Sequence, residues 1–205
     1  MGSQIPEDVL NLLRPRKGHF LLESGHHGDL WLDLELLCTH PNRIQPLCSE
    51  LAERLRPFNA DVICGPLVEG AFVALLVASN LGAPFSYSER FARPTPNGLF
   101  PAGYRLPEAL HRIVRGKRVA IVNDVINAGS AVRGTFDALD QCHAQIVAIA
   151  TLLTLGNSAQ DFANSKHVPL VTLAALVNML WPPASCPLCL AGVALDDIGG
   201  FRTKL

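Results

Sequence analysis

Short apolar runs along the 205-residue chain alternate with longer stretches in which apolar residues recur every three or four positions. The runs are rich in β-branched residues and are typical of strands buried on both faces of a parallel sheet, whereas the stretches with helical spacing predict helices between them. The expected strands cover residues 61–64, 84–87, 119–122, 145–154 and 170–176, and the clearest helices cover 41–56 and 71–81. This alternation predicts an α/β fold built on a parallel sheet with right-handed crossovers.

The first forty residues follow a different pattern. We expect a short helix over 6–13 and two strands over 17–22 and 30–36, on either side of a turn at 24–29. His26 and His27 lie in this turn. Because histidines in turns are usually exposed, we prefer a surface position for both of them to a catalytic role.

Residues 118–135 carry the clearest candidate chemistry. A buried strand is followed by Asn123 and Asp124, and then by the small-residue turn at 127–131, which opens a helix. The turn amides and the helix dipole would attract an anion, of which phosphate is the common example. The acid before the turn could hold hydroxyl groups near that phosphate, so the pattern favours a phosphorylated sugar as the ligand.

Two loops are expected to join this turn at the ligand-binding edge. In open parallel sheets the ligand lies beyond the carboxyl ends of the strands, where residues 65–70 and 154–157 should also fall. A third loop, at 91–103, contains three prolines and two glycines, and its length indicates a functional or mobile segment. Its only basic residue is Arg93, with Arg90 and Arg105 beside it.

Composition narrows the choice of partners. A net charge of -1 gives no support for nucleic-acid binding, and 49% hydrophobic residues are ample for one core. A charged content of only 17% indicates a partly covered surface and favours an oligomer. We expect a cytoplasmic chain without a membrane span, because the sequence has no run of 18 apolar residues and no basic and apolar start. Four cysteines in apolar or helical contexts are expected to be buried thiols, namely Cys38, Cys48, Cys64 and Cys142.

The stretch at 118–135 resembles the phosphoribosyl-diphosphate (PRPP) signature of type I phosphoribosyltransferases. That signature is a hydrophobic strand, two acids and a short run that ends in glycine, any residue and a hydroxyl residue. Here Asp124 matches the second acid, Gly129 the glycine, and Ser130 follows it, while Asn123 replaces the first acid. The alternative is an ordinary strand-turn-helix unit with an N-cap, which we disfavour because signature and context agree.

The resemblance covers most of the chain and is strongest to orotate phosphoribosyltransferases. The segments that carry it are residues 18–20 with 24–25, 30–33, the pyrophosphate loop at 65–70, and 89–90. It implies the type I phosphoribosyltransferase fold, in which helices flank a parallel sheet and a small N-terminal hood covers one end. We therefore expect a single domain over 1–205, with 1–40 and the C-terminal tail forming the hood and edge elements, and a homodimer.

The chemistry implied by the resemblance is displacement at C1 of PRPP by a ring nitrogen, with release of pyrophosphate, as part of nucleotide metabolism. Mg²⁺ would be bound mainly through PRPP, without a dedicated protein cage. The residues expected at the reacting centre are Asp124, Asn123 and Arg93. Those expected to bind PRPP are Asn127, Ala128, Gly129, Ser130, Ala131, Val68, Glu69, Gly70 and Arg90. Those expected at the acceptor base are Glu23, Leu30, Trp31 and Leu155.

Several positions depart from the family pattern. Asn123 lacks the charge of the usual acid, Glu69 stands where a small residue is preferred, and the loop at 91–103 lacks the usual lysines and histidine. Glu23 and Leu155 align near a lysine and an arginine that meet orotate. We therefore predict a nitrogen heterocycle other than orotate as acceptor. The alternatives are a non-catalytic PRPP- or nucleotide-binding protein and an ordinary orotate phosphoribosyltransferase of pyrimidine synthesis.

The tail contains one further motif, Cys186-Pro187-Leu188-Cys189. Its spacing is that of a zinc-binding pair, but a structural zinc site needs four ligands and no second pair follows. The alternative, which we prefer at this point, is a tail that packs on the core. Similar tails occur in some bacterial and archaeal orotate phosphoribosyltransferases.

Overall fold

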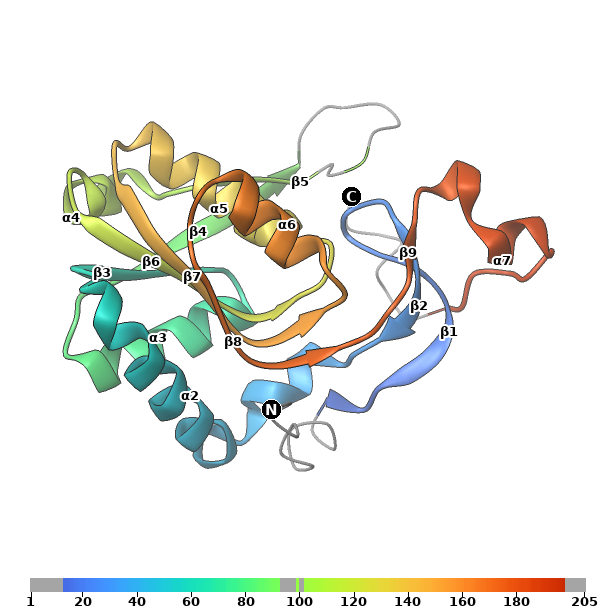
Figure 1. Cartoon of the computed structure of the whole chain (residues 1–205), viewed down its shortest axis with the longest axis horizontal. Helices are drawn as coiled ribbons and strands as arrows, with labels where there is room; N and C mark the ends of the chain where they lie inside the picture. Colours follow the sequence, from blue (N-terminus) through green and yellow to red (C-terminus); the bar gives the residue numbers. More distant parts are fainter. Residues whose placement is uncertain (1–12, 93–98, 100–101, 198–205) are drawn as a thin grey trace.

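The computed structural model describes residues 13–92, 99 and 102–197 (Figure 1). Its main sheet has six strands in the order β5-β4-β3-β6-β7-β8. Only the edge pair β4–β5 is antiparallel. The strands are β3 (Val62–Pro66), β4 (Phe85–Ala92), β5 (Ala102–Arg105), β6 (Arg118–Ile126), β7 (Gln145–Leu155) and β8 (Leu170–Leu176). The predicted α/β fold with a largely parallel sheet is confirmed.

Helices cover both faces of this sheet (Figure 1). One face packs on α2 (Pro41–Leu55) and α3 (Glu69–Leu81), and the other on α5 (Ser130–Gln141) and α6 (Ser158–Ser165). Residues 119–122 of β6 are all apolar because both faces of the strand are buried: Ala120 and Val122 belong to the first core, and Val119 and Ile121 to the second. The remaining helices are short: α4 (His111–Val114), α7 (Pro187–Leu190), and the 3₁₀ helices η1 (Leu34–Thr39), η2 (Arg56–Phe58), η3 (Glu108–Leu110) and η4 (Pro183–Ser185). None of the helices in these described ranges is long and apolar enough to cross a membrane.

A second, antiparallel sheet of three strands forms a hood beside the main sheet (Figure 1). It consists of β1 (Arg16–Leu21), β2 (His27–Trp31) and β9 (Leu180–Trp181). The third strand comes from the C-terminal tail and pairs His27 with Trp181. The two ends of the described chain are therefore brought together in one small layer.

The structure corrects four details of the sequence prediction, of which three concern the hood and the loop after β3. The second hood strand is β2, which ends at Trp31, so the expected strand over 30–36 is wrong and its second half is the 3₁₀ helix η1. His27 lies within β2 and is 7% exposed rather than on a turn at the surface. Part of the expected loop at 65–70 is regular structure, since β3 continues to Pro66 and α3 begins at Glu69.

A fourth correction concerns the polar pair after the signature strand. β6 runs through Asn123 and Asp124 to Ile126 instead of ending at Val122. Its backbone stays in the sheet because it continues to pair with β7, with Asn123 opposite Thr151 and Val125 opposite Leu153. The two polar side chains are consequently buried near the carboxyl ends of the parallel strands. Hydrogen bonds to a ligand can compensate there for the loss of solvent.

Candidate functional site

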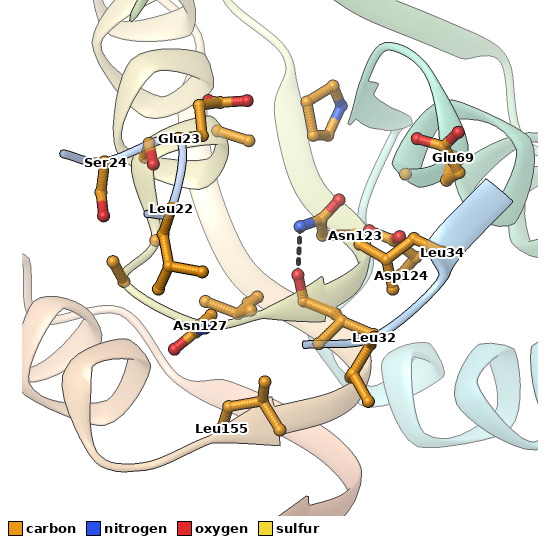
Figure 2. A pocket seen from close by; sticks show the side chains of 18 of the residues that line it. Leu22, Glu23, Ser24, Leu32, Leu34, Glu69, Asn123, Asp124, Asn127 and Leu155 are labelled. Carbon is orange, nitrogen blue, oxygen red and sulfur yellow. Dashed lines mark hydrogen bonds between the residues drawn. The ribbon is translucent and has the colours of Figure 1, made fainter. Parts of the chain in front are cut away.

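A cavity of about 250 Å³ lies at the carboxyl edge of the parallel strands, between the main sheet and the hood. Its walls come from the hood hairpin, from the loop after β3 and from the segment that joins β6 to α5 (Figure 2). Figure 2 also shows Glu23 and Glu69 on opposite sides of this cavity, with Asn123 and Asp124 between them. The pocket therefore joins the three regions in which the sequence placed candidate residues.

The turn between β6 and α5 forms one end of the pocket, lined by Asn127, Ala128, Gly129, Ser130 and Ala131. Gly129 has a φ of 84°, a left-handed conformation that favours glycine, and precedes the first residue of α5. Among the described residues no side chain caps this helix start, so its amides are available to a ligand. Asn127 is held in place because its Oδ1 accepts a hydrogen bond of 2.7 Å from Nδ2 of Asn178. This end of the pocket can bind a phosphate group.

Asp124 and Asn123 form the buried polar floor of the pocket. Nδ2 of Asn123 donates a 2.9 Å hydrogen bond to the carbonyl oxygen of Val125 (Figure 2). Oδ2 of Asp124 is buried and has no hydrogen-bond partner in the described structure. Burial, together with the negative charge of Glu69, raises the pKa of Asp124 to about 7. A buried carboxyl oxygen without a partner is suited to accept hydrogen bonds from sugar hydroxyls.

The loop after β3 and the first turn of α3 bring Val68, Glu69 and Gly70 to the opposite wall. The peptide bond between Leu67 and Val68 is cis. Gly70 leaves no room for a side chain, because a Cβ there would overlap Oδ1 of Asn123. The loop and the end of β6 are thus in close contact, and Glu69 adds a second carboxylate to the pocket near Asp124.

Glu23, at the tip of the hood hairpin, makes two contacts that the sequence did not predict. Its Oε1 accepts a 2.9 Å hydrogen bond from the hydroxyl of Tyr104, and its Oε2 lies 3.7 Å from Nε of Arg90. Burial, with the charge of Glu23 close by, raises the pKa of Tyr104, so the phenol remains a neutral donor. Arg90, expected at the diphosphate, does not line the pocket and faces Glu23 instead. Arg93 lies outside the described residues.

The other positions expected at the acceptor also line the pocket. Leu30 and Leu155 are buried, and the Trp31 indole N–H donates a 3.0 Å hydrogen bond to Asp33. Sequence reasoning missed several lining residues, namely Leu22, Leu32, Leu34, Glu35 and Tyr104. Leu32 lies just beyond the end of β2 and two positions after Leu30, so the alternation of apolar residues there could have indicated it. Tyr104 belongs to the edge strand β5, and no local sequence pattern reveals that this strand lies close to the hood.

The pH dependence of folding tests the state of Asp124. We expect Asp124→Asn to stabilise the unliganded protein more at pH 8 than at pH 5, by on the order of 2 kcal/mol. The folded-state pKa of about 7 lies above the ordinary value of 3.8. Between these two pH values the Asp124 carboxyl is ionised in the unfolded chain but stays protonated in the native protein. The contribution of this carboxyl to the free energy of unfolding therefore falls as the pH rises to 7. An amide does not titrate.

Urea denaturation of both proteins at the two pH values measures this difference. A stability gap between variant and parent that is equal at pH 5 and pH 8 would show that Asp124 has an ordinary pKa.

Comparisons with known proteins identify the family of this chain. A family model described as "Phosphoribosyl transferase domain" matches residues 39–172. A protein of Phenylobacterium zucineum named orotate phosphoribosyltransferase is 30% identical, over 97% of this chain and 98% of its own. One of the same name from Caldanaerobacter subterraneus is 28% identical, over 91% and 90%.

A solved structure shares the fold. The orotate phosphoribosyltransferase of Mycobacterium tuberculosis, in complex with inorganic phosphate, aligns with a TM-score of 0.58 and 22% identity, over 82% of this chain and 91% of its own. The family model spans more than half of this chain, and the sequence matches extend over nearly all of it. The protein therefore belongs to the phosphoribosyltransferase family and is a pentosyltransferase enzyme.

Proposed function

We propose that this enzyme transfers the 5-phosphoribosyl group of PRPP to a nitrogen heterocycle without a carboxylate. One observation carries the proposal. Beside the turn at 127–131, the described lining of the pocket contains four carboxyl groups, those of Glu23, Glu35, Glu69 and Asp124, and no lysine or arginine. A pocket of this charge suits a sugar phosphate held by amides and a neutral or cationic base, and it disfavours an anionic one.

In this proposal the chain mainly positions the reactants. The amides of 128–131 and the hydroxyl of Ser130 hold the 5-phosphate, and Asp124 accepts hydrogen bonds from the ribose hydroxyls. The residues before α3 face the diphosphate. A ring nitrogen of the acceptor then forms a bond to C1 while the bond from C1 to the diphosphate oxygen breaks, and pyrophosphate leaves with the bonding electrons.

The donor set of the pocket fits Mg²⁺, which the resemblance implies. Carboxylate oxygens are ligands that Mg²⁺ prefers, and Asp124 and Glu69 present them where the PRPP hydroxyls and diphosphate would lie. A cation there would also offset the repulsion between Glu69 and a diphosphate. When bound, Mg²⁺ would neutralise charge that develops on the leaving group.

The acceptor end of the pocket supports the choice of a base without a carboxylate. Leu155 is 2% exposed and presents an apolar wall. Glu23 presents a carboxylate, although Arg90 and Tyr104 offset part of its charge. A second candidate acceptor is orotate, and two observations favour it: this partial neutralisation of Glu23, and the names of the relatives described above.

We also infer that the active protein is a homodimer, as the resemblance implies. Phe72 and Leu75 support this inference, because both are large, apolar and about half exposed on α3. They lie three positions apart, which places them on one helix face that a second copy could cover.

A substrate panel tests the proposed acceptor. With PRPP and Mg²⁺, we expect neutral and amino-substituted heterocycles to release pyrophosphate and orotate to react orders of magnitude more slowly. Glu23→Gln should raise the orotate rate, because it removes the negative charge nearest the base. Glu89→Gln is the matched control, since Glu89 also pairs with an arginine at 3.7 Å but does not line the pocket. Orotate turnover at roughly 10⁴ M⁻¹s⁻¹ or more would establish the second candidate instead.

A further inference from the structure

Four potential metal ligands converge where the hood meets the C-terminal tail. His19 comes from β1, His27 from β2, and Cys186 and Cys189 from the start and the body of α7. One side-chain atom from each of these residues lies within 4.8 Å of the others. None of the four lines the substrate pocket. Figure 1 shows α7 beside β1 and β2, although more than 150 positions separate it from these two strands in sequence.

Three of the following four distances between these atoms match those of a tetrahedral zinc site, and the fourth is shorter. Nε2 of His19 lies 2.9 Å from Nδ1 of His27 and 3.4 Å from Sγ of Cys186. Sγ of Cys189 lies 3.3 Å from Nδ1 of His27 and 3.8 Å from Nε2 of His19. With zinc–nitrogen bonds of about 2.0–2.1 Å and zinc–sulfur bonds of about 2.3 Å, a tetrahedron places its ligand atoms roughly 3.3–3.8 Å apart. Small side-chain movements would complete the geometry.

The surroundings of His19 orient it for this role. Its Nδ1 lies 2.8 Å from the carbonyl oxygen of Val193, and a carbonyl can only accept, so Nδ1 carries the proton. Nε2 therefore turns a lone pair toward His27 and the two sulfur atoms. A carbonyl that fixes the ring in this way is a common outer partner of metal-bound histidines. The backbone of His19 is anchored as well, by two 2.7 Å hydrogen bonds with Asp196.

We propose that His19, His27, Cys186 and Cys189 bind one Zn²⁺ ion. Two imidazoles and two thiolates in a tetrahedral arrangement are the donor set typical of zinc. The two thiolates neutralise the ion, so the hood gains no net charge, and the thiol protons go to solvent. All four positions of the tetrahedron are filled by protein, which makes the site structural rather than catalytic.

The site joins the tail to the hairpin that forms one wall of the pocket. His19 and His27 stand on either side of the turn that contains Leu22, Glu23 and Ser24, and all three of these residues line the pocket. Zinc would hold the two strands and α7 at a fixed spacing. The metal is thereby expected to order the acceptor side of the pocket without touching a substrate.

Metal analysis of the full-length protein tests the site independently of its activity. Protein purified under reducing conditions without an affinity tag should contain one zinc per chain, and X-ray absorption should show two sulfur and two nitrogen neighbours. Cys186→Ser and Cys189→Ser should each lose the metal. Cys142→Ser, which changes another buried cysteine far from the cluster in sequence, should keep it.

Cobalt substitution of the unmodified protein covers the case in which the cysteine variants fail to fold. Tetrahedral Co²⁺ with thiolate ligands gives intense visible bands and a sulfur-to-metal absorption in the near ultraviolet. Three results would overturn the proposal. These are a reduced parent protein that binds neither zinc nor cobalt, a zinc content that both cysteine substitutions leave unchanged, and a Cys186–Cys189 disulfide as the only cross-link.

Discussion

Replacing Gly129 with tryptophan is expected to weaken PRPP binding by about 100-fold or more. The first reason is steric, since an indole at the start of α5 would cover amides that face the pocket. The second is conformational, because a φ of 84° disfavours any residue with a side chain and the loop would relax away from its present shape. Two charge-assisted hydrogen bonds lost to the 5-phosphate would account for about 3 kcal/mol or more.

Calorimetric titration with PRPP and Mg²⁺ measures this loss. Gly116→Trp is the matched control, since Gly116 has a φ of 68°, has open space around it and does not line the pocket. Both variants should lose similar stability, whereas only Gly129→Trp should lose affinity. Equal PRPP affinity in the two variants would mean that the 5-phosphate binds elsewhere.

Removal of the Asp124 carboxylate should lower kcat/KM for PRPP by roughly 10- to 150-fold, which corresponds to about 1.5–3 kcal/mol for hydrogen bonds to a charged group. Asp124 is 4% exposed, and its Oδ2 has no partner within the described chain, so a bound ribose would find an acceptor ready for its hydroxyls. Steady-state kinetics of Asp124→Ala measures the effect. Asp140→Ala, an exposed acid near the end of α5, is the control. An unchanged kcat/KM for Asp124→Ala would remove this residue from the reacting centre.

Asn123→Asp provides a sharper comparison at the neighbouring position. It restores the acid that the family signature usually carries there. However, Nδ2 of Asn123 donates to the carbonyl of Val125, and a carboxylate in its place would set two acceptors 2.9 Å apart. We therefore expect the substitution to lower stability and turnover. A rise in turnover would show that Asn123 merely lacks the catalytic contribution of the acid that the family usually carries at this position.

The unit formed by β6 and α5 could be predicted from the sequence, because the residues that determine it follow one another along the chain. A continuous apolar run, a polar pair, a small-residue turn and helical spacing follow one another without interruption. The end of β6 could not be predicted, because Asn123 and Asp124 look like strand terminators, and only their pairing with β7 keeps them in the sheet.

Contacts between distant segments account for what the sequence did not reveal. The partners of Cys186 and Cys189 are single histidines more than 150 positions earlier, so no second cysteine pair signalled them. The two contacts of Glu23 come from β4 and β5, across the gap between hood and sheet. The sequence predicts Glu23 at the acceptor base without these partners, whereas the structure shows it as one member of a group of three.

The contacts among Glu23, Tyr104 and Arg90 restrict how the choice of acceptor could change in evolution. Because Glu23 contacts both Tyr104 and Arg90, a lysine at position 23 would place a cation within reach of the guanidinium and would remove the acceptor that the phenol has in the described structure. A reversal of charge at this position therefore requires coordinated substitutions at Arg90 and Tyr104. Libraries that randomise positions 23, 90 and 104 together should recover altered acceptors that single-site libraries miss.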